Sequence, residues 1–243
     1  MSRFFICPEA VKGERIVING KEAHHILDVM RLKVSDSVVT FDGTGKEYSG
    51  IIKNVSRNSL TVEITATRTL SGKGQPRIIL IQALPRKAKM DYIVEKATEL
   101  GVHAIVPVIA ERTVPVWNEE KMRAHVQRWT KIATAAAKQC GRLDIPQVFA
   151  LAKFKDALEK LAGVNLKLIA VLSEEAVPLK EVIRGSGAGQ IAIAIGPEGD
   201  FTAGEAEYAR SLAFKAVDLG PRVLKSDTAG LALLSILNYE LSN

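Results

Sequence analysis

Five short, almost continuously apolar runs lie between residues 77 and 220, and helical stretches separate most of them. Runs of this kind, without polar alternation, are typical of strands that are covered on both faces of a parallel sheet. The pattern therefore predicts an α/β domain in which helices cover a parallel sheet. The expected strands are 77–84, 104–109, 166–172, 190–195 and 215–220, and the expected helices are 88–101, 118–139, 155–162 and the segment after Phe201.

The first seventy residues are rich in β-branched and alternating runs separated by turn residues, which predicts a small β-barrel or sandwich. One helix, expected over residues 20–33, interrupts this pattern and would place His24 and Arg31 on the same side. The stretch 69–76 is rich in Gly, Ser and Pro and predicts a linker. We therefore expect two domains, 1–70 and 77–243. The strands expected in the first are 15–18, 37–42, 47–55 and 59–65, and the apolar stripe of its helix is Ala23, Ile26, Leu27, Met30 and Val34.

Composition narrows the classes of protein to which the chain can belong. No apolar run reaches the roughly 20 residues that cross a bilayer, and the two cysteines are too few for a disulfide framework and show no metal-ligand spacing. We therefore expect a cytoplasmic protein without a metal site. The formal charge of +6 is compatible with a polyanionic partner, although basic stretches such as 127–131 and 138–142 also fit solvated helix faces.

Three polar or glycine-rich segments follow expected strands: "VLSEEA", "IGPEGDF" and "DLGPRVLKSDTAG". Ligands of parallel sheets bind at the carboxyl ends of the strands, so these segments predict the walls of one pocket. In the middle segment Gly196 and Gly199 allow backbone to approach a ligand, and Pro197 stiffens the turn. Glu198 and Asp200 would repel a phosphate and favour a neutral or cationic ligand. Taken alone, the segment 195–201 also fits an ordinary tight turn.

Helix starts follow two of these segments. Thr202 and Glu205 have the spacing of a capping box. Ser226, Asp227 or Thr228 could serve as N-cap of a strongly apolar C-terminal helix, which we expect to be buried in the core or against another subunit. The standard nucleotide fingerprints, G-x-G-x-x-G after the first α/β strand and G-x-x-x-x-G-K-[ST], do not occur in the sequence.

The motifs together, in their order and spacing, resemble the ribosomal RNA small subunit methyltransferase E family. The resemblance rests on "GPEGDFTAGE", "LGPRVLKSDTA", "DYIVEKATELGV", "ERTVP", "AAAKQCGRLDIP" and "HHILDVMRLKVSDSV" and spans most of the chain. It implies an N-terminal PUA-like RNA-binding domain, a C-terminal SPOUT domain with a trefoil knot, and a homodimer. It also implies methyl transfer from S-adenosylmethionine to ring nitrogen N3 of a uridine in 16S rRNA, in the bacterial cytoplasm.

The resemblance also assigns residues to the cofactor. A sulfonium is cationic, so nearby carboxylates are tolerable where a phosphate would not be. The expected cofactor residues are Leu172, Ile195, Gly196, Pro197, Glu198, Gly199, Leu219, Gly220, Val223, Leu224, Thr228 and Ala229.

The chain departs from the family's usual Arg-x-Glu-Thr-Ala at residues 225–229, where it reads Lys-Ser-Asp-Thr-Ala. Lysine does not replace a planar bidentate arginine, so the roles of Lys225 and Asp227 are open. Attack by a ring nitrogen requires loss of its proton and a positive field near the uracil oxygens. Lys225 or Arg222 is expected to supply that field, and a carboxylate such as Asp227, or water, to accept the proton.

RNA contacts are expected from Arg and Lys side chains, which give salt-dependent affinity rather than sequence choice. Aromatic residues make up only 5% of the chain, which favours structured RNA read through its shape over extensive base stacking. The expected contacts are Arg3, His24, Arg31, Arg86, Lys87, Lys89, Arg112, Arg128, Gln139 and Arg142.

Two alternatives stay open at this point. A related knotted methyltransferase could act on tRNA or on a ribose hydroxyl, and a non-catalytic RNA-binding assembly factor could retain the fold. Cys140 is expected to be a packed helix residue, because attack from a ring nitrogen needs no cysteine adduct.

Overall fold

The computed structural model describes residues 3–70, 74–86, 89–114, 117–184 and 189–242. The chain divides into two compact units: residues 1–72 with 134–145, and residues 73–133 with 146–243. The segment 134–145 contains the last turns of a long helix, so that helix contributes to both units. The expected linker falls partly on residues 71–73, which lie outside the described residues.

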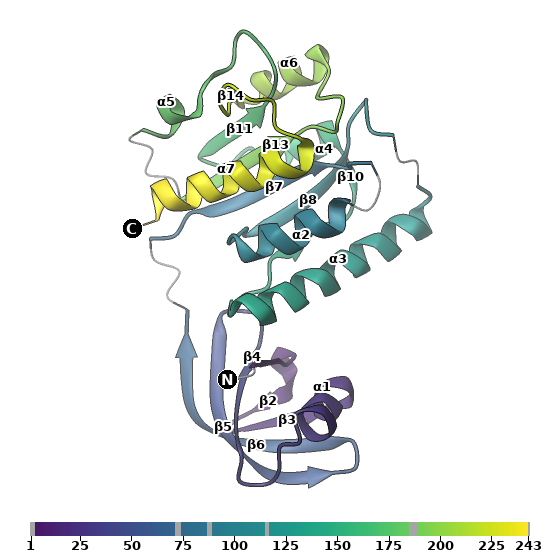
Figure 1. Ribbon diagram of the computed structural model, residues 1–243, viewed down its shortest axis with the longest axis vertical. Helices are drawn as coiled ribbons and strands as arrows, with labels where there is room; N and C mark the ends of the chain where they lie inside the picture. Colours follow the sequence, from purple (N-terminus) through teal and green to yellow (C-terminus); the bar gives the residue numbers. More distant parts are fainter. Residues whose placement is uncertain (1–2, 71–73, 87–88, 115–116, 185–188, 243) are drawn as a thin grey trace. The chain divides into compact units, whose positions relative to one another are not determined.

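The first unit contains a six-stranded sheet in the part of the chain described here, with the order β1-β4-β5-β6-β3-β2. Figure 1 shows β2 to β6 of this sheet in purple to blue. All pairs are antiparallel except β1 with β4. Its core includes the fully buried Ile16, Ile26 and Ile52. The elements are β1 (Arg3–Phe5), a 3-10 helix (Pro8–Ala10), β2 (Val11–Lys12), β3 (Arg15–Asn19), α1 (Gly20–His24), a π-helical segment (His25–Val29), β4 (Ser37–Phe41), β5 (Lys46–Ser56) and β6 (Ser59–Thr69).

The helix expected over residues 20–33 ends earlier than the sequence predicted. Arg31 has a φ of 58°, in the left-handed region, and the N–H of Leu32 donates to the Ile26 carbonyl at 3.0 Å. Arg31 is therefore outside the helix, and the prediction that it shares a helix side with His24 is wrong. Met30 and Val34, expected in the apolar stripe, are exposed.

Gly50 of β5 pairs with Ile64 of β6, beside a register shift between Ser49 and Gly50. A Cβ at this position would overlap the Val62 side chain and lie 2.5 Å from the Glu63 carbonyl oxygen. We expect Gly50→Ala to lower the free energy of unfolding by about 1–3 kcal/mol, because overpacking forces the strands apart. Urea denaturation measures this, with Gly163→Ala as control because its Cβ would meet nothing within 4 Å. Equal stability of the two variants would contradict the expectation.

The second unit contains an eight-stranded, fully parallel sheet among the described residues, as the apolar runs predicted. Its order is β10-β8-β7-β13-β11-β14-β12, with β9 paired to β8. The elements are β7 (Arg77–Ala83), α2 (Lys89–Glu99), β8 (Ala104–Ile109), α3 (Glu119–Cys140), β9 (Gln147–Val148), β10 (Ala152–Lys153), α4 (Phe154–Glu159), β11 (Leu166–Ala170), β12 (Val177–Pro178), α5 (Leu179–Ile183), β13 (Gln190–Ile195), α6 (Ala203–Ser211), β14 (Lys215–Asp218) and α7 (Ser226–Leu241).

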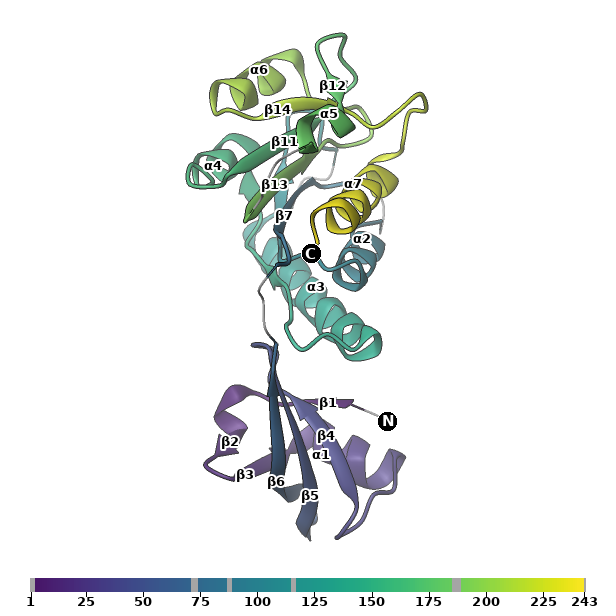
Figure 2. The same ribbon diagram turned by 90° about the vertical axis from the view of Figure 1, so that its left-hand side faces the viewer.

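Helices cover both faces of this sheet. Figure 2 shows α2 and α7 on one side and α4 and α6 on the other. The centre of the sheet is correspondingly apolar on both faces: Ile191, Ile193 and Ala194 of β13 are fully buried. This two-sided burial is the physical reason why these strands read as continuous apolar runs.

Two local expectations have different outcomes. The capping box at the start of α6 is present: the Thr202 hydroxyl accepts from the Glu205 N–H, and the Glu205 carboxylate accepts from the Thr202 N–H. At the start of α7, however, the N-cap position is Lys225 and no side chain caps the helix. Ser226 is the first helical residue and its hydroxyl bonds elsewhere, so the N-cap prediction is wrong. The apolar side of α7 is buried, with Leu233, Leu234 and Leu237 inaccessible.

Candidate functional site

A cavity of about 420 Å³ lies at the carboxyl ends of β13, β11 and β14, which are neighbours in the sheet. Its walls are the segments that follow these three strands, together with Lys89 at the start of α2. The volume is within the range of small-molecule sites. The predicted meeting of three segments at one pocket is thus the observed geometry.

Ten of the twelve expected cofactor residues line this cavity: Leu172, Ile195, Gly196, Pro197, Glu198, Leu219, Gly220, Val223, Leu224 and Ala229. Gly199 and Thr228 are described residues but are not in its lining. The lining also contains residues that the sequence did not single out for it, among them Lys89, Asp200 and Ser226. Lys89 was expected to contact RNA instead.

Asp200 connects the segment after β13 to the segment after β11 by a hydrogen bond. Its carboxylate accepts from the Leu172 N–H at 2.9 Å and from the Phe201 N–H at 2.8 Å. Asp200 itself has a φ of 60°, a conformation that Asp tolerates better than most residues. A Cβ on Gly196 would lie 3.1 Å from the Asp200 Oδ1 atom, so a larger residue would require this carboxylate or its loop to shift.

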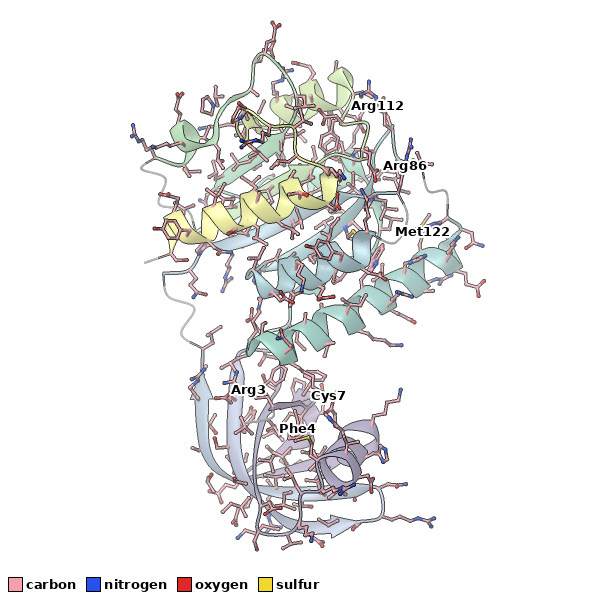
Figure 3. All side chains as sticks on the ribbon, viewed as in Figure 1. Arg3, Phe4, Cys7, Arg86, Arg112 and Met122 are labelled. Atoms are coloured by element: carbon pink, nitrogen blue, oxygen red, sulfur yellow. The ribbon has the colours of Figure 1, made fainter. Side chains whose placement is uncertain are left out.

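Glu198 ties the same segment to the β7–α2 connection. Its two carboxylate oxygens accept from the Arg86 N–H at 3.0 and 3.1 Å, and one of them lies 3.4 Å from the Lys89 Nζ. Arg112 adds a hydrogen bond of 2.7 Å from its guanidinium to the Gly199 carbonyl. Figure 3 shows Arg86 and Arg112 at the same end of the second unit, beside this loop. The Glu198 carboxylate therefore already has hydrogen-bond and ion-pair partners within the protein.

The start of α7 brings a second carboxylate, Asp227, to Lys89. Lys89 Nζ lies 3.3 Å from Asp227 Oδ1, and this hydrogen bond, with a smaller contribution from Glu198, raises the pKa of Lys89. Lys89 is consequently protonated at neutral pH. Asp227 retains about a quarter of its side-chain exposure, at 23%.

Arg222 and Lys225, the expected catalytic cations, both line the cavity and are exposed. In contrast to Lys89, neither has a side-chain hydrogen bond or ion pair within the part of the chain that the structure describes. The cavity mouth also holds two strongly exposed apolar side chains, Leu172 at 69% and Val223 at 74%. Exposed apolar groups in a concave site indicate a ligand with an apolar or aromatic surface.

Several of the residues expected to contact RNA have partners inside the protein. Arg3 pairs with Glu47, His24 with Asp28, Arg128 with Asp91 and Arg142 with Asp144. Arg31, Arg86 and Gln139 are exposed, and Lys87 lies outside the described residues. Cys140 is exposed at the end of α3, so its expected packing is wrong.

The described residues contain no group of three or more His, Cys, Asp or Glu side chains that could hold a metal ion. None of their helices is both long enough and apolar enough to cross a membrane.

Known proteins share this architecture and sequence. The family described as RNA methyltransferase domain matches residues 73–238, and the RNA methyltransferase PUA domain matches residues 18–65. A crystal structure of a ribosomal RNA small subunit methyltransferase E from Neisseria gonorrhoeae, bound to S-adenosyl methionine, is 30% identical with a TM-score of 0.86 and covers 98% of this chain and 97% of its own. The chain belongs to the ribosomal RNA small subunit methyltransferase E family.

Other relatives of this methyltransferase family agree. The Bacillus subtilis ribosomal RNA small subunit methyltransferase E is 29% identical, and the match covers 99% of this chain and 97% of the relative. A methyltransferase from Legionella pneumophila, solved in complex with the cofactor, is 28% identical with a TM-score of 0.85 and covers 98% of this chain and 96% of its own. The expected α/β sheet and the N-terminal PUA domain are therefore confirmed, while the trefoil knot stays a prediction.

Proposed function

We propose that this chain transfers a methyl group from S-adenosylmethionine to ring nitrogen N3 of a uridine in 16S rRNA of the small ribosomal subunit. The observation that carries the proposal is the cavity formed by the segments after β13, β11 and β14. These segments hold motifs on which the resemblance to the family rests, and two solved relatives are bound to this cofactor.

The residues of the cavity fit the cofactor. Leu172 and Val223 offer exposed apolar surface to an adenine ring, and Gly196 and Gly220 keep the walls free of side chains. Asp200 and Glu198 add negative charge, which suits a sulfonium and disfavours a phosphate. The bound cofactor would supply an electrophilic methyl group on a positively charged sulfur. Gly199 and Thr228, outside the lining, would act on the cofactor only through their neighbours.

The target base would approach from the side of α7. Arg222 and Lys225, which have no ion pair among the described residues, would place positive charge near the uracil oxygens as the ring loses its proton. Asp227 would accept that proton, directly or through water.

The PUA domain and the exposed cations would hold the RNA. Arg31, Arg86 and Gln139 are the most available of the expected contacts, while Arg3, His24, Arg112, Arg128 and Arg142 would have to exchange internal partners. We also infer a homodimer, because α2 and α7 expose Tyr92 at 51% and Tyr239 at 84%. A cytoplasmic location follows from the proposed substrate.

Transfer of a radioactive methyl group tests the proposal. Purified protein and labelled S-adenosylmethionine are incubated with small ribosomal subunits, with naked 16S rRNA and with tRNA, and cofactor binding is measured separately by calorimetry. We expect label in the rRNA of one or both ribosomal substrates. Label in tRNA would favour the related tRNA enzyme, and no cofactor binding at millimolar concentration would favour a non-catalytic assembly factor.

A further inference from the structure

Beneath the cavity lies a chain of buried hydrogen bonds that joins three elements. Gln82, at the end of β7, is fully buried, and its amide Nε2 donates to the Ala83 carbonyl and to the Ser226 Oγ, each at 3.1 Å. The Ser226 hydroxyl in turn donates to the Gly196 carbonyl at 2.6 Å. We call Gln82, Ser226 and the Gly196 carbonyl the buried relay.

Stability alone does not account for the relay. The Gln82 Oε1 atom is buried and has no hydrogen-bond partner among the described residues. A buried acceptor that loses water without gaining a donor costs free energy, which offsets part of what the two Nε2 hydrogen bonds contribute. The site is also tightly packed: a Cβ on Gly230 of α7 would lie 3.3 Å from this oxygen. The presence of an amide at this position is therefore better explained by the hydrogen bond that Gln82 Nε2 donates to Ser226.

The Gln82 Nε2 atom restrains the wall of the cavity through its hydrogen bond to Ser226. Ser226 and Gly196 both line the cavity, and Ser226 is 7% exposed. Serine at a helix start commonly bonds the helix's own backbone, but here no side chain caps α7 and the hydroxyl points to the neighbouring loop. Because the Ser226 hydroxyl donates its hydrogen to the Gly196 carbonyl, its oxygen is oriented to accept the hydrogen bond from Gln82 Nε2. Each polar group of the relay therefore orients the next one.

The consequence is a fixed orientation of the Gly196 peptide. Pro197 has no N–H, so the carbonyl oxygen of Gly196 is the only group through which hydrogen bonding can hold this peptide. The same hydrogen bond joins Gly196 to the first turn of α7, between Lys225 and Asp227. The relay thus links the cofactor wall to the helix start that carries the expected catalytic groups.

We propose that Gln82 and Ser226 are positioning residues that hold the Gly196 peptide in the orientation the cofactor requires. The inference rests on the proposed function, since S-adenosylmethionine is the ligand named there. Neither residue need touch the cofactor: Gln82 acts through Ser226, and Ser226 acts through Gly196.

Calorimetry with S-adenosylmethionine and S-adenosylhomocysteine tests this, together with the unfolding midpoint of each ligand-free variant. We expect Ser226→Ala to weaken binding of both ligands about tenfold, and Ser226→Thr, which keeps the hydroxyl, to bind within about threefold of the wild type. Gln82→Met is expected to weaken binding in the same direction, while its midpoint stays within about 4 °C of the wild type. Ser211→Ala is the matched control, because the Ser211 hydroxyl donates to the Tyr208 carbonyl on the surface of α6.

Binding by Ser226→Ala that equals the wild type would overturn the proposal. So would parallel losses of affinity and midpoint in all three relay variants, because a purely structural role moves both together. Failure of the wild-type protein to bind either ligand would contradict the proposed function itself. The two failures are therefore distinguishable in one set of titrations.

Discussion

Replacing Gly196 by valine is expected to weaken S-adenosylmethionine binding about 100-fold. The new Cβ would lie 3.1 Å from Asp200 Oδ1, 3.1 Å from the Phe201 nitrogen and 3.2 Å from the Asp200 carbonyl carbon. Two of these atoms are backbone, so the loop itself must shift. Overpacking costs about 1–3 kcal/mol, and tenfold in affinity is about 1.4 kcal/mol.

The same displacement would break the bond from the Leu172 N–H to Asp200, because Asp200 moves with the loop. Calorimetry measures the affinity, and Gly204→Val is the control. Gly204 lies in the first turn of α6, and a Cβ there would meet nothing within 4 Å. Near-normal affinity of Gly196→Val, or an equal loss in the control, would contradict the assignment of this loop to the cofactor.

Asp227→Asn is expected to lower the rate of methyl transfer about 10²- to 10⁴-fold, the usual contribution of a positioned general base. Asparagine keeps the size and the first-turn position in α7 but removes the proton acceptor. Cofactor affinity should stay within about threefold, because Asp227 is not part of the cavity lining. Single-turnover rates at saturating cofactor measure the effect.

Glu181→Gln is the control for Asp227→Asn. Glu181 is an exposed carboxylate on α5, and it is likewise absent from the cavity lining. The Asp227 assignment would be contradicted by a single-turnover rate within about threefold of the wild type. Water or another group would then accept the proton, and Lys225→Ala and Arg222→Ala would separate the contribution of the two cations.

The longer strands and helices of the second unit follow from the sequence, whereas the two-residue strands β9, β10 and β12 and the five-residue helix α5 were not expected. Apolar runs such as 190–195 lie in the interior of a two-sided sheet, so burial alone is enough to specify them. The sequence also predicted that the loops after β11, β13 and β14 meet, because the carboxyl ends of parallel strands lie at the same edge of the sheet. In the first unit the long strands were equally clear, but the end of the helix was not, since Arg31 enters the left-handed region without a glycine to mark it.

The contacts that organise the cavity could not be predicted from the sequence. Glu198 meets Arg86 and Lys89 over a separation of more than a hundred residues, and Gln82 meets Ser226 over a separation of 144. Such pairs depend on how α2 and α7 pack beside the sheet, which periodicity does not encode. That the acidic residues of the middle loop disfavour phosphate stays a prediction; in the structure Glu198 and Asp200 bond to neighbouring loops.

The domain boundaries drawn from sequence, 1–70 and 77–243, stay a prediction. The two compact units of the structure place residues 134–145 with the first, since Arg3 donates to the Gly141 carbonyl and Lys138 pairs with Glu22. Both contacts join segments far apart along the chain, so a boundary based on local composition has no access to them.

Mass mapping of 16S rRNA from cells that lack this protein tests the proposed methylation of uridine N3. We expect 3-methyluridine to be lost at one position, wild-type protein to restore it, and Asp227→Asn not to restore it. Unchanged 3-methyluridine in the deletion strain, or loss of a methyl group from a different atom or from tRNA, would contradict the proposal.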